Sequence, residues 1–283
     1  MTCAVIGLGS MGQRYAIYFR QQRVKVVGCD PNREVFPADV SCTETVDELL
    51  ETTTPDVVVI ASPAAHHLST LYAVRARHPN CAVLLEKPVT HQPLTADDLH
   101  RFGAMHGDTT AVGYCWRFHP YARQLHTARR AIRELTLYVG SDMRRWPGQH
   151  YVDPLREFSH ELDLVTYLTS MPRVDDVGFT PQGRYQIDGT HRRGRWSVRI
   201  APFQSPPGRW IKTVMSDRSV FTYHWDVRPH VIESMYRSQV SQVMRATGPS
   251  DLSCPLSAGI QTTRLVDEIE GRLDLKGKAW QVM

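Results

Sequence analysis

A glycine-rich turn constrains the fold of this chain more than any other feature. The segment GLGSMG, residues 7–12, follows a short apolar run and opens the first stretch with helical periodicity. In a strand–turn–helix frame, Gly7 permits the tight turn, Gly9 lets the backbone approach a pyrophosphate, and Gly12 lets the helix pack on the strand. The amides at the N-terminus of the helix then face the anion. We therefore expect a dinucleotide site that also includes Leu8, Ser10 and Met11, with a purely structural glycine turn as the alternative.

An acidic residue follows at the spacing that dinucleotide-binding domains use. Asp30 lies 23 residues after Gly7, at the end of the predicted second strand. A carboxylate at this position accepts hydrogen bonds from the adenosine ribose and repels a 2′-phosphate, so it favours NAD over NADP. Arg33 could face such a phosphate, so NADP is the alternative cofactor.

The hydrophobic pattern changes midway along the chain. Up to residue 114, short and nearly continuous apolar runs alternate with helical stretches, which is typical of a parallel sheet covered on both faces. From about residue 135 the pattern is a two-residue alternation interrupted by turn-rich pieces, which is typical of antiparallel strands. We predict an α/β Rossmann domain with a doubly wound parallel sheet over residues 1–118. An α+β domain with an open, mainly antiparallel sheet should follow over residues 119–283, for substrate binding and oligomerisation, with helices over 159–169, 230–247 and 256–273.

Composition excludes several other classes of protein. Of the 283 residues, 42% are hydrophobic, but the longest apolar runs are far shorter than the ~20 residues of a membrane-spanning helix. The N-terminus lacks the cationic region of a signal peptide. Six widely separated cysteines without a CxxC pair argue against a zinc site and against a disulfide framework. We expect a reduced, cytoplasmic protein that binds no metal and no membrane, and the scattered arginines do not favour nucleic acid as a partner.

Polar residues follow two strands of the predicted parallel sheet. The segment ASPAAHH places Ser62, Pro63 and His67 at the carboxyl edge, where open α/β sheets bind ligands. The next strand ends in EKP, which contains Glu86 and Lys87. Lysine, unlike arginine, can exchange a proton when it is partly buried. In a chain with five lysines, Lys87 is therefore the best acid/base candidate; the alternative is a surface lysine that extends its stem beside a turn proline.

Several segments together resemble one family of oxidoreductases. GLGSMGQRY, ASPAAHH, LLEKP and VGYCWRFHP, in this order and spacing, resemble the Gfo/Idh/MocA family, the glucose-fructose oxidoreductase and inositol dehydrogenase group. SHELDLVTYL resembles the family's histidine-bearing helix, and PLSAGIQTTRLVDEI resembles its closing helix. The resemblance implies hydride transfer between nicotinamide C4 and a hydroxyl or keto carbon of a sugar, aminosugar or nucleotide-sugar, at a site between the domains.

The resemblance also implies roles for individual residues. Lys87 would take the hydroxyl proton and His160 would hydrogen-bond the same hydroxyl. Asp163, three residues later on the same helical face, could orient the imidazole. The family commonly has an aspartate four residues before this histidine, where this chain has Arg156, and Glu157 could supply the missing carboxylate. As an alternative, His160 is a helix N-terminal residue satisfied by the backbone.

The same resemblance predicts substrate contacts. It places Tyr114, Trp116, Arg117 and His119 of VGYCWRFHP beside the nicotinamide and the substrate, where aromatic faces and an arginine suit sugar rings and acidic groups. The alternative is that this segment packs the two domains together. Arg144, at the end of a strand, is a further candidate for binding a diphosphate or a sugar carboxylate.

Other functions on this fold stay open. Arg156 in place of an acid is compatible with a catalytically silent dinucleotide-binding regulator. The same fold also serves reductases of non-sugar substrates, namely linear tetrapyrroles, imines and dihydrodiols. We expect a homodimer or homotetramer, with a dimer that forms through the open face of the sheet.

Overall fold

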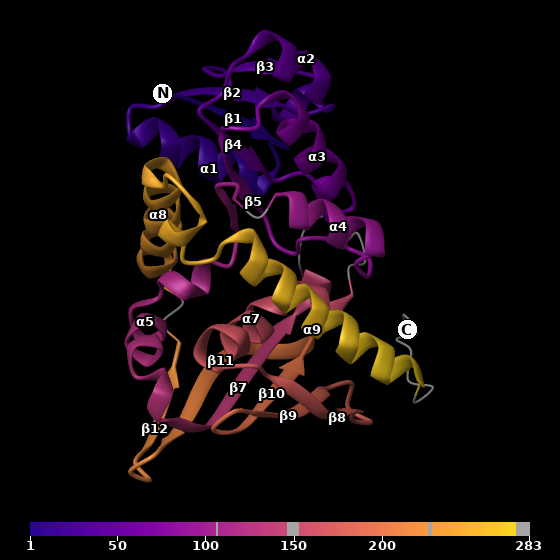
Figure 1. Ribbon diagram of the computed structural model, residues 1–283, viewed down its shortest axis with the longest axis vertical. Helices are drawn as coiled ribbons and strands as arrows, with labels where there is room; N and C mark the ends of the chain where they lie inside the picture. The colour runs from indigo at the N-terminus through magenta and orange to yellow at the C-terminus, as the bar shows by residue number, and fades with distance from the viewer. Residues whose placement is uncertain (106, 146–152, 226–227, 276–283) are drawn as a thin grey trace. The chain divides into compact units, whose positions relative to one another are not determined.

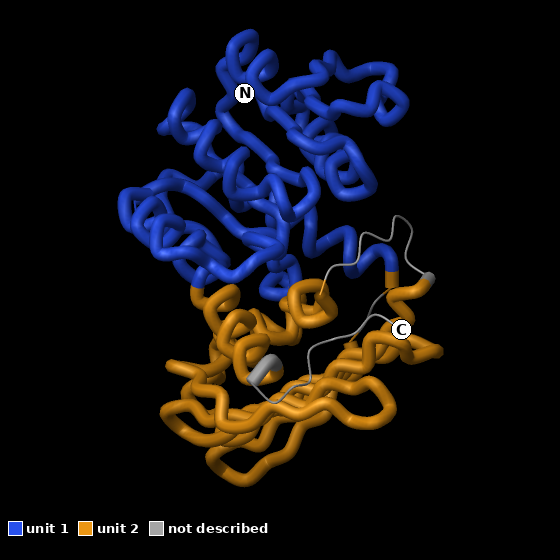
Figure 2. Tube along the Cα trace, turned by 90° about the vertical axis from the view of Figure 1, so that its right-hand side faces the viewer, with its two compact units in different colours: residues 1–118, 229–260 blue, residues 119–228, 261–283 orange. Residues whose placement is uncertain are grey.

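The computed structural model describes residues 1–105, 107–145, 153–225 and 228–275. The chain packs into two compact units, residues 1–118 with 229–260 and residues 119–228 with 261–283. Figure 1 labels the helices and strands, and Figure 2 colours the two units. Each unit contains one six-stranded sheet.

The sheet of the first unit is parallel throughout. Its strand order, β3-β2-β1-β4-β5-β6, reverses direction between β1 and β4, as in a doubly wound fold. Nearly every side chain of β1, β2, β4, β5 and β6 is buried, which explains the continuous apolar runs in the sequence. The predicted Rossmann fold is confirmed. Its strands are β1 (Thr2–Ile6), β2 (Lys25–Cys29), β3 (Ser41–Thr43), β4 (Val57–Ile60), β5 (Ala82–Leu85) and β6 (Thr110–Val112).

Helices cover both faces of this sheet. Side chains of α1 and α8 share one buried apolar cluster with the strands, and side chains of α2, α3 and α4 share the other. These helices are α1 (Ser10–Gln21), α2 (Val46–Thr52), α3 (His67–Arg77), α4 (Ala96–Ala104) and α8 (Pro229–Arg245). Short 3₁₀ turns complete the unit: η1 (Arg33–Val35), η2 (Ala64–His66), η3 (Cys115–Phe118) and η6 (Pro249–Asp251).

Helix α8 shows where the linear division at residue 118 differs from the packing. The sequence places this helix in the second domain, but it packs with the first unit. It buries Met235, Val240 and Val243, and the ring of Tyr236 meets those of Tyr15 and Tyr18 on α1. Periodicity reveals an apolar helix face but not the surface that covers it. The assignment of dinucleotide binding to 1–118 and of substrate binding to 119–283 stays a prediction.

The second unit contains an open, mainly antiparallel sheet, as predicted. Its order is β12-β11-β7-β10-β9-β8, in which the pair β7 and β10 is parallel and the other pairs are antiparallel. Along β7, Leu135, Leu137 and Val139 are buried in alternation with less buried residues, and α7 packs on β7 and β10. The strands are β7 (Ile132–Asp142), β8 (Arg173–Phe179), β9 (Tyr185–His191), β10 (Gly194–Ala201), β11 (Phe203–Met215) and β12 (Val220–His224).

Three short helices and most of a long one belong to the second unit. The short helices are α5 (Pro120–Thr127), α6 (Pro154–Glu157) and α7 (Ser159–Leu168), with 3₁₀ turns η4 (Arg129–Ala131) and η5 (Met143–Arg145). The long helix α9 (Leu256–Leu275) begins in the first unit and continues in the second from residue 261. Within the part of the chain that the structure describes, no helix combines the length and apolar character needed to cross a bilayer.

Candidate functional site

The glycine turn after β1 has the geometry that the sequence predicts. Gly7 has φ +89°, and a Cβ there would lie 2.4 Å from the backbone nitrogen of Ser62. A Cβ on Gly12 would lie 1.8 Å from the carbonyl oxygen of Gly7. A Cβ on Gly9 would meet no atom within 4 Å, so the chain itself does not require glycine there. The turn therefore leaves open space above Gly9, as the close approach of a ligand requires.

The other residues of the turn differ in what they can offer a ligand. The side chain of Leu8 is buried in the core, so only its backbone faces the turn. Ser10 is exposed and Met11 is partly exposed, both in the first turn of α1. That turn contains no acidic residue, so no carboxylate of its own competes for the amides at the helix N-terminus.

Asp30 joins the end of β2 to the glycine turn. Its Oδ2 accepts a hydrogen bond from the Leu8 N–H at 2.7 Å, and its Oδ1 accepts one from the Asn32 N–H at 2.9 Å. A carboxylate has about four acceptor positions, so it retains capacity for ribose hydroxyls. The sequence spacing thus places the acid beside the turn, as expected.

Arg33 is held by a neighbouring acid. Its Nε donates to Glu44 Oε1 at 2.7 Å, and its Nη2 forms an ion pair with the same carboxylate. This hydrogen-bonded pairing raises the pKa of Arg33 above its ordinary value. The guanidinium that could face a 2′-phosphate is thus bound to Glu44.

Ser62 and Pro63 follow β4 at the carboxyl edge of the sheet, the edge that also carries the glycine turn. The Ser62 Oγ is buried and has no hydrogen-bond partner within the described residues. Because buried hydroxyls normally have partners, this oxygen is suited to contact a polar ligand. Pro63, the next residue, is exposed.

His67 links two loops of the predicted site. Its ring is 1% exposed, with Nδ1 2.7 Å from the Pro88 oxygen and Nε2 2.8 Å from the Ser62 oxygen. Burial lowers the pKa of His67. Both ring nitrogens face backbone oxygens, so the histidine joins the loop after β4 to the loop after β5.

The EKP segment follows β5 at the carboxyl edge. Glu86 is buried; its Oε1 accepts from the Tyr15 hydroxyl at 2.5 Å, and its Oε2 accepts from the Lys87 N–H at 3.0 Å. Lys87 itself is partly buried. Because the strands are parallel, the glycine turn, Asp30, Ser62 and Lys87 follow the carboxyl ends of β1, β2, β4 and β5 at one edge of the sheet.

The predicted substrate residues in and just before η3 are largely interior. Tyr114 is 1% exposed and Trp116 is 4% exposed. The buried guanidinium of Arg117 donates from Nη1 to the Ser253 oxygen at 2.7 Å, which joins η3 to the segment before α9. Their contact with a substrate stays a prediction.

His119 opens the second unit at the N-cap of α5. It is 2% exposed, and its Nδ1 accepts from the Tyr121 N–H at 3.2 Å. Its ring lies edge-on to Trp225, with 4.5 Å between centroids. These contacts give His119 a capping and packing role in the described structure.

Helix α7 carries the predicted histidine and acid. His160 is partly buried in the first turn, and Asp163 is 1% exposed, with its Oδ1 accepting from the Thr262 hydroxyl at 3.1 Å. The motifs did not single out Glu161, which is 1% exposed and forms an ion pair at 2.7 Å with Arg209 of β11. An acid in a largely apolar helix is the sequence signal that could have indicated a buried pair.

Arg156 serves as a buried anchor in α6. It forms ion pairs with Asp267 at 2.8 Å and with Glu270 at 2.5 Å, both on α9. Burial raises the pKa of Glu270 to about 7, which outweighs the opposite effect of Arg156. Glu157 ends α6 and is partly buried. The residue in place of the family's aspartate therefore links two helices.

Arg144 points to solvent at the end of β7. It pairs with Asp142 at 2.8 Å, and its guanidinium lies 5.5 Å from the ring centroid of Phe203. Its side chain is 66% exposed, so it is accessible to an anionic group.

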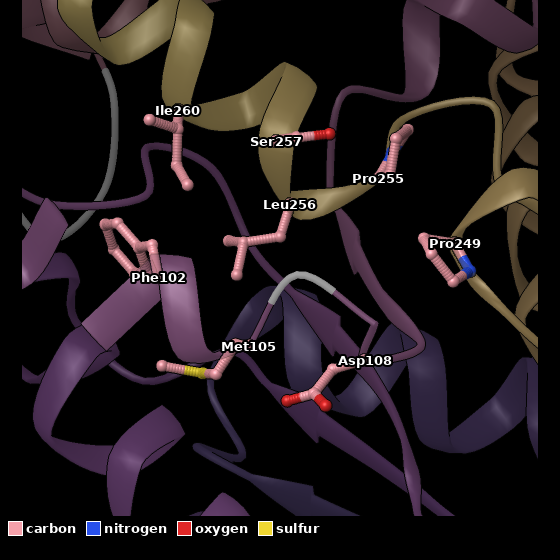
Figure 3. Close-up of a pocket in the computed structure, with 8 residues that line it drawn as sticks. All are labelled: Phe102, Met105, Asp108, Pro249, Pro255, Leu256, Ser257 and Ile260. Atoms are coloured by element: carbon pink, nitrogen blue, oxygen red, sulfur yellow. The ribbon is translucent and has the colours of Figure 1, made fainter. Parts of the chain in front are cut away.

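A separate pocket lies between α4 and the start of α9 in the first unit (Figure 3). Its lining includes none of the predicted site residues. In the close-up, Leu256 extends toward Phe102 and Met105, which gives this part of the pocket an apolar character. The lining residues are Phe102, Met105, Asp108, Pro249, Pro255, Leu256, Ser257 and Ile260.

A comparison with known protein families identifies the fold of residues 1–114. Residues 1–114 match the model of the Gfo/Idh/MocA family, described as an oxidoreductase family with an NAD-binding Rossmann fold. Residues 1–114 belong to the Gfo/Idh/MocA oxidoreductase family. The expected family is confirmed, and with it an NAD-binding oxidoreductase fold. No curated protein sequence matches the chain significantly.

Several solved structures share the fold of nearly the whole chain. A myo-inositol dehydrogenase from Corynebacterium glutamicum has 14% identity and a TM-score of 0.80, with 98% of this chain and 97% of that chain covered. The UDP-N-acetylglucosamine 3-dehydrogenase GnnA from Acidithiobacillus ferrooxidans has 18% identity and a TM-score of 0.72, with coverages of 96% and 97%. The WlbA dehydrogenase from Thermus thermophilus, in complex with NAD and α-ketoglutarate, has 16% identity and a TM-score of 0.75, with coverages of 95% and 94%. At sequence identities this low, the structural similarity shows only that the chains share a fold.

The residues of the Gfo/Idh/MocA domain fit the family's cofactor. The open space at Gly9 admits a close ligand, the Ser62 Oγ is a buried hydroxyl that needs a partner, and the Asp30 carboxylate retains acceptor capacity. The turn follows β1 and Ser62 follows β4, the two strands that flank the point where the strand order reverses, and Asp30 follows β2, next to β1. NAD is the cofactor of this family, as the sequence predicts.

Proposed function

We propose that the protein is an NAD-dependent dehydrogenase that acts on a CH–OH group of a sugar, aminosugar or nucleotide-sugar. The observation that carries this proposal is the position of Lys87 at the carboxyl end of β5, at the edge that also carries the glycine turn and Asp30. NAD, when bound, supplies the hydride acceptor. A lysine at the same edge can take the proton that the hydroxyl releases.

The roles of the other residues follow from the same proposal. His160 hydrogen-bonds the substrate hydroxyl, and Asp163 orients its imidazole. Glu157 supplies the carboxylate that the family has where this chain has Arg156. The turn residues, Ser62 and Asp30 bind the dinucleotide, and Arg144 binds an anionic group of the substrate. The buried contacts of Trp116, Arg117 and His119 support a role in shaping the site rather than in direct hydrogen bonding.

The proposed substrate class takes support from proteins of the same fold. Two of them are a myo-inositol dehydrogenase and a UDP-N-acetylglucosamine 3-dehydrogenase, whose named substrates are ring-shaped and rich in hydroxyl groups. The small-molecule substrate and the homodimer or homotetramer are both part of the proposal.

The test combines cofactor binding with a substrate screen. We expect NADH to quench or sensitise the fluorescence of the purified protein saturably, and a panel of cyclic polyols and UDP-sugars to reduce NAD. In Lys87→Ala, turnover should fall by about 10²–10⁴-fold because the proton acceptor is missing, while the NADH Kd changes only a few-fold. Lys25→Ala, at the exposed start of β2, is the control and should keep both properties. Normal turnover in Lys87→Ala would remove this lysine from the mechanism.

Arg156 supports a second candidate function. Because the position of the family's acid carries a buried, ion-paired arginine, the protein could bind dinucleotide without turnover, as a regulator. This alternative predicts saturable NADH binding and no reaction with any member of the panel, and turnover by the wild type would exclude it.

A further inference from the structure

A buried polar cluster lies directly behind the EKP lysine. Tyr15, five residues into α1, is 0% exposed, and its hydroxyl donates to Glu86 Oε1 at 2.5 Å. The tyrosine therefore connects the helix that begins at the glycine turn with the segment that carries Lys87. The segment GLGSMGQRY ends at this tyrosine, but the sequence pattern assigned it no role.

Glu86 also contacts the backbone of Lys87. Its second oxygen, Oε2, accepts the Lys87 N–H at 3.0 Å, so the two carboxylate oxygens have different partners. A Cβ on Gly113 would lie 2.9 Å from the carboxylate carbon of Glu86. Glycine at this position thus makes room for the buried carboxylate, whose orientation depends on its hydrogen-bond donors.

The tyrosine ring is itself held from a second side. Gln239 of α8 is 1% exposed; its Oε1 lies 3.2 Å from the Tyr15 hydroxyl, and its Nε2 donates to the Val112 oxygen at 3.3 Å. The ring of Tyr236 contacts the Tyr15 ring edge-on, with 5.9 Å between centroids. Burial, followed by the charge of Glu86, raises the pKa of Tyr15 well above its ordinary value, so the phenol keeps its proton and remains a donor.

We propose that Tyr15 is a positioning residue: its hydroxyl orients the Glu86 carboxylate, which holds the Lys87 backbone in place at the dinucleotide edge. Packing alone would need the ring but not the hydroxyl. The geometry therefore separates two contributions of one side chain, the ring to the core and the hydroxyl to the lysine segment. The catalytic meaning of this link rests on the proposed function of Lys87.

The experiment removes only the hydroxyl, in Tyr15→Phe, and reads the Lys87 backbone amide. Protein labelled with ¹⁵N-lysine gives few amide signals because the chain has five lysines, and Lys87→Arg identifies the signal of residue 87. We expect this signal to shift and its hydrogen exchange to accelerate in Tyr15→Phe, because Glu86 Oε1 loses the tyrosine donor that orients the carboxylate. Phenylalanine keeps the aromatic ring, so a ring-current change does not account for such a shift.

Tyr18→Phe is the matched control. Tyr18 lies on the same helix, is also buried, and stacks on Tyr236 at 6.4 Å, so its variant tests the loss of a tyrosine hydroxyl away from Glu86. The Lys87 signal should stay in place in this control. An unchanged Lys87 amide in a folded Tyr15→Phe variant would overturn the proposal. If Tyr15→Phe does not fold, Glu86→Leu decides, because a leucine side chain cannot accept the Lys87 N–H: an unchanged Lys87 amide overturns the proposal there too.

The kinetic readout separates positioning from binding. With a substrate from the screen, Tyr15→Phe should lower kcat about tenfold and leave KM within twofold, because a displaced lysine impairs proton transfer more than binding. A wild type without turnover would contradict the dehydrogenase proposal, whereas the amide signal would still decide for or against the role of Tyr15.

Discussion

At the scale of single residues, Gly9 is a position where the fold tolerates a side chain but the bound cofactor is predicted not to. Its φ is −66°, and a Cβ would meet nothing within 4 Å, so alanine fits the folded chain. A methyl group there would project into the space expected for the pyrophosphate. We predict that Gly9→Ala keeps the wild-type melting temperature and weakens NADH binding at least tenfold in a fluorescence titration.

Two other glycines serve as controls for this prediction. Gly103→Ala on α4, also without neighbours within 4 Å, should change neither property, whereas Gly12→Ala should lower the melting temperature because its Cβ would clash with the Gly7 oxygen. Unchanged NADH affinity in Gly9→Ala would mean that the turn is only structural.

Glu44 is predicted to affect the choice between NAD and NADP. It binds the Arg33 guanidinium beside Asp30, and both side chains are largely exposed, so the ion pair is weak. Glu44→Gln should release Arg33 and raise NADPH affinity about two- to fivefold, with NADH affinity unchanged, as measured by parallel titrations. In Glu44→Gln/Arg33→Ala this gain should disappear; a gain that persists would come from a residue other than Arg33.

At the scale of elements, the link between α6 and α9 is predicted to depend on pH. The folded-state pKa of Glu270 is about 7, above its ordinary value of 4.5, because burial disfavours the carboxylate; Asp153 and Asp267 raise it further and Arg156 lowers it. A raised pKa means that the folded protein binds the proton more tightly than the unfolded chain. The associated stability is therefore fully present below pH 4.5 and is lost as the pH rises toward 7.

Glu270→Gln tests this dependence. The amide cannot ionise, so the free energy of unfolding of the wild type should fall relative to the variant between pH 4.5 and 8, by at most roughly 3 kcal/mol. Urea unfolding of both proteins at several pH values measures the difference. If the free energies of unfolding of the two proteins differ by the same amount at pH 5 and at pH 8, Glu270 does not titrate in this range.

The elements also show how far sequence patterns reach. The strands of the first unit were predictable because burial on both faces requires continuous apolar runs, and the sheet of the second unit because one buried face requires alternation. The partner of Arg156 was not predictable. Asp267 and Glu270 lie more than a hundred residues away on a helix whose charged positions look like an ordinary solvent-exposed face.

At the scale of the whole molecule, the first unit is built from two separate stretches of chain. Val240 and Val243 of α8 belong to the same buried cluster as Tyr15 and Phe19 of α1. We predict that a fragment of residues 1–118 alone does not unfold cooperatively, because this apolar surface is exposed. Joining residues 229–260 to it through a flexible Gly/Ser linker should restore a cooperative thermal transition and NADH binding. Cooperative unfolding of the short fragment would show that α8 is dispensable for this unit.

The sequence by itself determined the local conformations and the positions of the residues that we expect to bind the cofactor. A turn, a strand end and a helix start are properties of a few adjacent residues, so GLGSMG, Asp30 and EKP could be placed at one edge of a parallel sheet before any coordinates. Only the tertiary structure decided that α8 returns to the first unit, that Arg156 is an anchor, and that Tyr15 contacts Glu86. Such contacts join residues distant in the chain, and they depend on which surfaces meet and exclude water, which no local pattern specifies.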